Sequence, residues 1–272
     1  MSVGVGATGG RGANVGAASA RGTSGGSPVR VVLFDLDDTL FAHRESVSAA
    51  LFAHVTALGA PYRLDDRDAE AAAWHVIEER HYHGYLAGEL DYDGQRRARA
   101  RDYAARHGVA LDDAAATAWF ASFFEHYLQS WRLHEDALPC LDALNGRFPG
   151  VRFGMITNGD EAHQRRKVER LGLDTRFEHI VSSGAVGVAK PDPRIFEHAC
   201  DLFGVASASA VYVGDRLTTD AVGAAHAGLT GVWLDRPEPS AEHPAADAIA
   251  EAQAAGVIRI TGLAELPAAL AR

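Results

Sequence analysis

Five short apolar segments, most of them followed by a helical pattern, constrain the fold of this chain more than any other feature. They are VVLFD at 31–35, RFGMIT at 152–157, HIVSS at 179–183, VYVGD at 211–215 and GVWLD at 231–235, and VIRI at 257–260 adds a short last one. Most are continuous apolar runs, which is typical of strands covered on both faces. Helical patterns near 161–172, 194–204 and 218–227 lie between them. This alternation predicts an α/β fold built on a doubly wound, mostly parallel sheet.

One long interval breaks the alternation. Residues 43–133 show helical periodicity and no clear strand, although a crossover between parallel strands needs only about a dozen residues. Within AWFASFFEHYLQSW, at 118–131, large apolar residues recur on one broad face, which indicates a packed core. Ser, Asp and Gly punctuation divides the interval into about four helices. We therefore expect a helical cap at 43–133, inserted into a core formed by 29–42 and 134–272.

The first 28 residues differ in composition from the rest. They are nearly all Gly, Ala, Ser and Val, without an acidic residue, and such a segment cannot bury enough apolar surface to offset its chain entropy. We predict that it is disordered. Gly4, Gly6 and Gly9 match GxGxxG, but that dinucleotide-binding pattern requires a preceding strand and a following helix, so we reject it.

Charge and cysteine content narrow the class of protein further. The formal net charge of −10 gives no basic surface of the kind that binds nucleic acid polymers. No apolar run reaches the length of a membrane span. Cys140 and Cys200 show no metal-ligand spacing, which favours reduced thiols. We expect a cytoplasmic monomer or homodimer whose partner is a small molecule, with no membrane association.

Polar residues follow the predicted strands at the point where each strand ends. In chain order they are Asp35, Asp37, Thr39, Thr157, Asn158, Gly159, Lys190, Gly214, Asp215 and Asp220. The carboxyl ends of parallel strands meet at one edge of a sheet, where ligands bind. Carboxylates repel one another and resist burial, so this set requires Lys190 and a metal ion as partners. Its oxygen-rich donors suit Mg²⁺ better than zinc.

Phosphoryl transfer is the chemistry that this set of residues suits. Lys190 and Mg²⁺ offset the charge of a phosphate ester, so that Asp35 can attack phosphorus in line. Asp37 can protonate the leaving alkoxide and then deprotonate the hydrolytic water. Thr157 and the amides of Asn158 and Gly159 can hold the phosphoryl oxygens. We expect Asp215 to bind the metal ion directly, and Asp220 to bind or orient it.

DLDDT, ITN, the lysine of AKPDP and GDRLTTD resemble the four ordered motifs of the haloacid dehalogenase superfamily, over about residues 30–235. The resemblance implies a Rossmann-like core, a helical cap of the C1 type found in subfamily I, and Mg²⁺-dependent phosphatase activity through an aspartyl-phosphate. It implies Asp35 as the nucleophile and Asp37 as the acid/base, with the backbone carbonyl of Asp37 as a further metal ligand. The stretches from ITNGDEAHQRRKVERLGL to VYVGDRLTTDAVGAAHAG look most like the branch of N-acylneuraminate-9-phosphatases and pyrimidine 5'-nucleotidases.

Other functions remain open beside a phosphatase acting on a sugar phosphate or a nucleotide. A phosphomutase of the same superfamily keeps Asp37 and is poorly separated by sequence. A regulatory protein on the same fold is disfavoured because the acidic set is intact. A dehalogenase attacks carbon and needs neither a metal ion nor the second aspartate, so Asp37 and Asp215 argue against it.

The cap contributes polar residues whose roles the sequence leaves open. His75, His81 and His83 are interpreted as surface or cap-lining residues rather than as a metal site. We expect the basic run formed by Arg96, Arg97, Arg99 and Arg101 to be a solvated helix face. Substrate contacts from Arg80, His83, Arg96 and Arg97 are the alternative.

Overall fold

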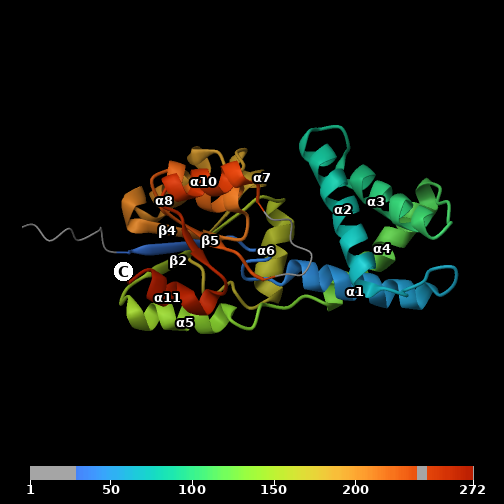
Figure 1. Ribbon diagram of the computed structural model, residues 1–272, viewed down its shortest axis with the longest axis horizontal. Coiled ribbons are helices and arrows are strands. Elements are labelled where there is room, and N and C mark those ends of the chain that lie inside the picture. The colour runs from blue at the N-terminus through green and yellow to red at the C-terminus, as the bar shows by residue number, and fades with distance from the viewer. Residues whose placement is uncertain (1–28, 238–243, 272) are drawn as a thin grey trace, which may run out of the picture.

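The structure is a computed structural model that describes residues 29–237 and 244–271 (Figure 1). Segment 1–28, with its predicted disorder and its GxGxxG match, lies outside the described residues. The described chain forms a lobe that contains the sheet and a second, all-helical lobe on the right of Figure 1. No helix in the described ranges combines the length and apolarity that a membrane span requires.

The sheet has the predicted parallel topology. Its strands are β1 (Val31–Phe34), β2 (Arg152–Thr157), β3 (His179–Ser182), β4 (Ala210–Gly214), β5 (Thr230–Leu234) and β6 (Ile258–Ile260). Within the described residues they lie in the order β3-β2-β1-β4-β5-β6, and every neighbouring pair is parallel. The two central strands, β1 and β4, are buried along their whole length, which explains their continuous apolar sequences. The predicted fold class is confirmed.

Helices cover both faces of this sheet. Helices α5 (Ala137–Arg147), α6 (Glu161–Arg170) and α11 (Leu266–Ala269) share one apolar cluster with it. The opposite face carries α8 (Pro193–Phe203), the π-helix η2 (Leu217–Val222), α9 (Gly223–His226) and α10 (Ala246–Ala254). Short helices α7 (Ser183–Val186), η1 (Ser207–Ser209) and η3 (Leu263–Glu265) complete the described core. Cys140 on α5 and Cys200 on α8 are free and buried.

The inserted lobe consists of α1 (His43–Leu58), α2 (Arg67–Leu86), α3 (Tyr92–Arg106) and α4 (Asp113–Gln129). An aspartate caps each of α2, α3 and α4 and accepts a hydrogen bond from a first-turn amide, as strong N-cap residues do. The aromatic stripe of α4 packs inward, with Trp119 and Phe123 against Trp74 of α2. Its role as core is confirmed for these rings, whereas Phe124 and Trp131 are half-buried.

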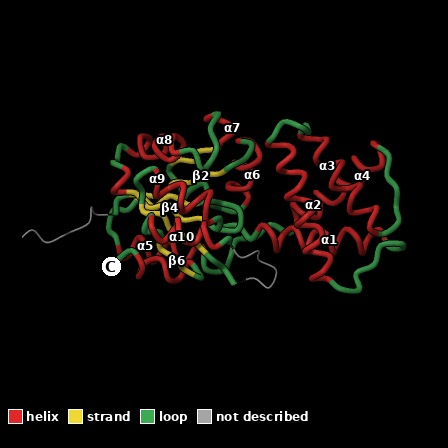
Figure 2. The backbone as a smooth tube through the Cα atoms, turned by 45° about the horizontal axis from the view of Figure 1, so that its top comes forward, coloured by secondary structure: helices red, strands yellow, loops and turns green. Residues whose placement is uncertain are grey.

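The two connections between the lobes run side by side. The backbone amide of Ala42 donates to the Arg132 carbonyl (3.0 Å), and the amide of His134 donates to the Leu40 carbonyl (2.9 Å). In Figure 2 the helical lobe lies beyond α6, next to the sheet-containing lobe. Because these bonds close the insertion at its base, we propose that the cap comprises residues 43–133.

Candidate active site

The chain reverses its strand order between β1 and β4, and Asp35 and Asp215 follow these two strands directly. Phe34 pairs with Val213 in the parallel register, and the Asp35 amide continues it by donating to the Val213 carbonyl (2.8 Å). The two aspartates therefore lie next to each other at the carboxyl edge of the sheet. In doubly wound folds this switch point is where ligands bind.

Lys190 connects the acidic residues of this edge. Its Nζ donates to Asp35 Oδ1 (2.6 Å), Asp220 Oδ1 (2.7 Å) and the Tyr212 hydroxyl (2.7 Å). Asn158 fixes the Lys190 backbone, since its Nδ2 donates to the Lys190 carbonyl (2.9 Å) and its Oδ1 accepts from the Lys190 amide (2.8 Å). The Asn158 side chain thus holds Lys190 in place, a role that the sequence did not indicate.

The acidic residues at this edge carry more negative charge than Lys190 alone can offset. Burial raises the pKa of Asp35 to about 8, with Lys190 opposing the rise and Asp220 and Asp215 adding to it. Burial, followed by the charges of Asp38 and Asp220, raises the pKa of Asp215 to about 8. One oxygen each of Asp35, Asp215 and Asp220 lies within 4.8 Å of the others. Three hard oxygen donors that require a further cation fit Mg²⁺.

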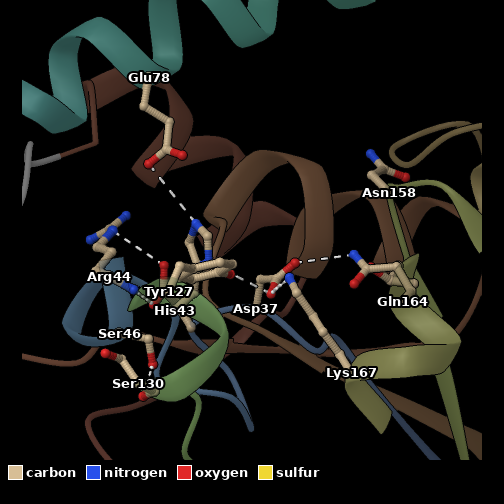
Figure 3. Close-up of polar contacts among 12 residues, drawn as sticks. Asp37, His43, Arg44, Ser46, Glu78, Tyr127, Ser130, Asn158, Gln164 and Lys167 are labelled. Carbon is tan, nitrogen blue, oxygen red and sulfur yellow. Dashed lines mark hydrogen bonds and ion pairs between the residues drawn. The ribbon is translucent and has the colours of Figure 1, made fainter. Parts of the chain in front are cut away.

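Asp37 lies in a different electrostatic environment, two residues further on (Figure 3). Its Oδ1 accepts from Lys167 Nζ (2.6 Å), and its Oδ2 accepts from Gln164 Nε2 (3.1 Å). His43 Nδ1 is 4.0 Å from Oδ1. Burial would raise the pKa of Asp37, but Lys167 and then His43 outweigh burial and hold it well below its ordinary value. Asp37 is therefore held as a carboxylate.

The remaining predicted site residues line the same edge. Thr157 is buried, and its Oγ1 accepts from Gln164 Nε2 (2.9 Å). Gly159 packs so closely that an added Cβ would lie 2.7 Å from Gln164 Nε2. Thr39 lies in the turn after β1 and is buried. Asp38 accepts from the Arg44 amide (2.8 Å) in the first turn of α1.

The cap reaches this edge through the face of α2 that carries Glu79 and Tyr82. The Tyr82 hydroxyl donates to the Asn158 carbonyl (3.2 Å), and Arg216 of the core donates to Glu79 (2.8 Å). His43 hydrogen-bonds with the Tyr127 hydroxyl of α4 (2.7 Å). Cap and core therefore meet beside Asp37.

Arg99 departs from the expected solvated helix face, whereas the Arg80 side chain is exposed. Arg99 is only 8% exposed and donates to Glu78 (2.8 Å), so the expectation for this residue was wrong. Its face of α3 packs against α2, and the acid on α2 compensates the buried charge. Arg96 lies over the Tyr92 ring, 4.0 Å from its centroid. Arg80 pairs with Asp102 inside the cap.

Gln164 and Lys167 are site residues that the sequence reasoning missed. They lie one turn apart on α6 and are both buried, although the sequence of this helix is strongly polar. The sequence did contain one signal that could have pointed to Lys167. Only two of the 26 lysine and arginine residues are lysines, Lys167 and Lys190. Each of them is 3% exposed and pairs with one aspartate of the β1 turn.

Fold and site together define a doubly wound α/β protein with an acidic edge whose donors suit a divalent cation. The chain belongs to the haloacid dehalogenase-like hydrolase family, whose pattern matches residues 29–228. It is 32% identical to the N-acylneuraminate-9-phosphatase of Rattus norvegicus over 77% of this chain and 84% of that protein. It is 30% identical to the glyceraldehyde 3-phosphate phosphatase of Methanopyrus kandleri over 76% and 84%.

One further comparison concerns the expected branch of N-acylneuraminate-9-phosphatases and pyrimidine 5'-nucleotidases, and another concerns the fold. The pyrimidine 5'-nucleotidase YjjG of Escherichia coli is 40% identical over a shorter region, 36% of this chain and 43% of that protein. The HAD-hydrolase YfnB of Bacillus subtilis, solved with bound magnesium, superposes with a TM-score of 0.68 over 90% of this chain and 99% of that one, at 22% identity. The expected superfamily resemblance and the inserted helical cap are confirmed.

Proposed function

We propose that this protein is a Mg²⁺-dependent phosphatase that hydrolyses a small phosphate monoester, a sugar phosphate or a nucleotide, through an aspartyl-phosphate on Asp35. The observation that carries the proposal is the contact between Asp35 and Lys190 (2.6 Å) at the strand edge shared with Asp215 and Asp220. A nucleophilic carboxylate, a buried ammonium and two further acids are the groups that phosphoryl transfer requires.

Asp35 and Lys190 would work as a pair in the first step. Lys190 holds Asp35 Oδ1 and offsets the negative charge of an approaching phosphate ester. The other carboxylate oxygen, Oδ2, then attacks phosphorus in line. The hydroxyl of Thr157 and the amides after it would hold the phosphoryl oxygens.

Asp37 would transfer the protons in both steps. Its carboxylate form suits the second step, in which it accepts a proton from the hydrolytic water. For the first step Asp37 must carry a proton. An anionic phosphoryl group beside it raises its pKa by like-charge repulsion, which favours the protonated acid when the substrate is bound.

Asp35, Asp215, Asp220 and the backbone carbonyl of Asp37 would hold the metal ion. Mg²⁺, when bound, supplies the positive charge that these acids lack. Asp220 also has a holding role of its own, because its Oδ1 accepts from Lys190 and its Oδ2 accepts from the Arg216 amide (3.0 Å). We expect it to fix Lys190 and the turn after β4 as well as the ion.

The substrate class rests on the relatives and on the cap. The relatives named above are phosphatases of small phosphate esters. Tyr82 and Glu79 of α2 contact the core at the strand edge, and we expect this face of the cap to lie near the leaving group. Sugar phosphates and nucleotides are esters small enough for such a covered site.

Phosphate release from a panel of sugar phosphates and nucleotides tests the proposal. We expect turnover with Mg²⁺, none in excess chelator, and poor turnover with Ca²⁺, whose larger and looser shell misplaces the nucleophile. Asp35→Asn should fold normally and be inactive. Activity in excess chelator would contradict the metal assignment. An isomerised ester in place of free phosphate would assign a phosphomutase instead.

A further inference from the structure

The other lysine of this chain, Lys167, is buried and directed at the acid/base rather than at the nucleophile. Lysine is almost never fully buried unless it is paired. Lys167 is 3% exposed, and its Nζ lies 2.6 Å from Asp37 Oδ1. The two residues are 130 positions apart in the sequence. The contact therefore depends on how α6 packs against the β1 turn.

Asp37 is held through both of its oxygens. Lys167 donates to Oδ1, and Gln164, one turn earlier on α6, donates to Oδ2. The same Gln164 amide also donates to Thr157 Oγ1 (2.9 Å). A carboxylate held at both oxygens has little freedom to rotate. Through Gln164 and Thr157, its orientation is also tied to β2.

The site is built for an ammonium group. Arginine supplies all of the other 24 basic residues of the chain, since two of the 26 are lysines. Lys167 Nζ lies 5.0 Å from the centroid of the Phe41 ring. A guanidinium is a wider, planar fork. In this space it would displace either Phe41 or the Asp37 carboxylate.

We propose that Lys167 and Gln164 are positioning residues, which aim the Asp37 carboxylate at the oxygen of the leaving group. The inference rests on the proposed function, because it assumes that Asp37 transfers the proton. Misplacement of a reacting group by about 1 Å can cost about 10²-fold in rate. Loss of either residue should therefore affect the esters that need a proton and spare those that do not.

The test compares two esters in a set of variants. A sugar phosphate releases a basic alkoxide, whereas nitrophenyl phosphate releases a stable phenolate that needs little protonation. The quantity measured is the single-turnover rate at which the first product, the alcohol or the phenol, is released. We expect Lys167→Met to lower this rate by about 10²-fold on the sugar phosphate. On nitrophenyl phosphate the rate should fall far less. KM should change little. Lys167→Arg should not restore the rate. Arg165→Met, an exposed position on the same helix, is the control and should behave as wild type.

A double mutant separates positioning from direct phosphate binding. If Lys167 acts through Asp37, the combination of Lys167→Met with Asp37→Ala is no slower than Asp37→Ala alone. An additional loss in the double mutant, or an equal loss on both esters in Lys167→Met, overturns the inference. Should Lys167→Met unfold, Gln164→Met must show the same dependence on the ester, and its absence overturns the inference equally. If Asp37→Ala leaves the ratio of the rates on the two esters unchanged, Asp37 does not transfer the proton, and that result would count against the proposed function itself.

Discussion

Asp35 and Asp37 are two residues apart, yet their surroundings shift their pKa values in opposite directions. Burial, with Asp220 and Asp215, raises the pKa of Asp35 to about 8. Burial also acts to raise the pKa of Asp37, but Lys167 and His43 together outweigh burial and lower it. Neighbouring carboxyl groups with separated pKa values are a sign of divided acid, base and nucleophile roles. Each aspartate contacts one lysine at 2.6 Å, so the division follows from their other neighbours: Asp220 and Asp215 add negative charge beside Asp35, whereas His43 adds to the effect of Lys167 beside Asp37.

Asp37→Ala tests that division at the level of one residue. Sugar phosphate hydrolysis should fall by about 10²- to 10⁴-fold, the usual contribution of a general acid or base. With nitrophenyl phosphate the first step survives in part and the second lacks its base. We therefore expect a burst of nitrophenolate near one equivalent of enzyme, followed by slow turnover.

Asp35→Asn is the matched control and should give no burst, since no carboxylate remains to carry the phosphoryl group. An equal slowing of both esters in Asp37→Ala, with no trappable phosphoenzyme, would remove the acid/base role from Asp37. The burst is followed by stopped-flow absorbance.

The strand-end residues were predictable from the sequence, while the residues of α6 were not. Parallel strands must bring Asp35, Lys190 and Asp215 to one edge, because each follows a strand or its loop. Gln164 and Lys167 reach the site only through the rotation of a helix about its axis. The polar sequence of that helix gives no apolar stripe from which its buried face can be read.

At the scale of elements, the π-helix η2 shows how closely the core packs. The sequence predicts an ordinary helix at 218–227, but the structure has η2 followed by α9. Gly231 of β5 lies directly beneath η2, and a Cβ added there would lie 2.1 Å from the Ala221 carbonyl oxygen. The glycine therefore permits backbone to approach backbone, a contact that no hydrophobic pattern reports.

Gly231→Ala should destabilise the protein by about 1–3 kcal/mol, the typical cost of overpacking, because the clash is with backbone. It should also reduce turnover, since η2 carries Asp220. Urea unfolding measures the first effect. Gly146→Ala on α5 is the control, because an added Cβ meets nothing within 4 Å, and it should be neutral or stabilise by up to about 1 kcal/mol. Equal stabilities of Gly231→Ala and wild type would contradict the close contact.

The cap helices contain a buried histidine that should make their stability depend on pH. His54 of α1 is 1% exposed, packs edge-on against Trp119 (4.4 Å between centroids), and has no hydrogen-bond partner among the described residues. Burial, with a smaller contribution from His126, lowers its pKa to about 4. Below about pH 6.5 the unfolded chain binds a proton at this residue that the folded chain does not. Stability must therefore fall as the pH falls from about 6.5 to about 4.

The melting temperature of wild type should accordingly decrease over this range more steeply than that of His54→Phe. His83→Phe is the control, because His83 is 68% exposed and should leave the pH profile unchanged. Superimposable profiles for wild type and His54→Phe would show that His54 is not the group that titrates.

At the scale of the whole molecule, the cap and the core are joined by their connections at Phe41 and Leu133 and by contacts made from α2. The existence of the cap was predictable, because helical periodicity without a strand marks an insertion. The side chains that face the core were not predictable. Arg80 and Arg96 were candidates, but they have partners within the cap, while the acidic Glu79 meets the core. The choice depends on helix packing within the cap, which no local pattern encodes.

The Glu79–Arg216 ion pair spans the two lobes and should hold the cap closed. Both partners are partly exposed, with side chains 28% and 46% accessible, so the pair is worth at most about 1 kcal/mol. A bias of that size changes the ratio of closed to open cap by about fivefold. We expect Glu79→Gln to raise KM for a sugar phosphate by up to about fivefold with little change in kcat or melting temperature. The difference should vanish near about 1 M salt, where exposed charges are screened.

Glu45→Gln, which breaks a pair with Arg132 at the base of the cap, is the control and should leave KM unchanged. If Glu79→Gln matches wild type at low salt, the pair does not hold the cap closed.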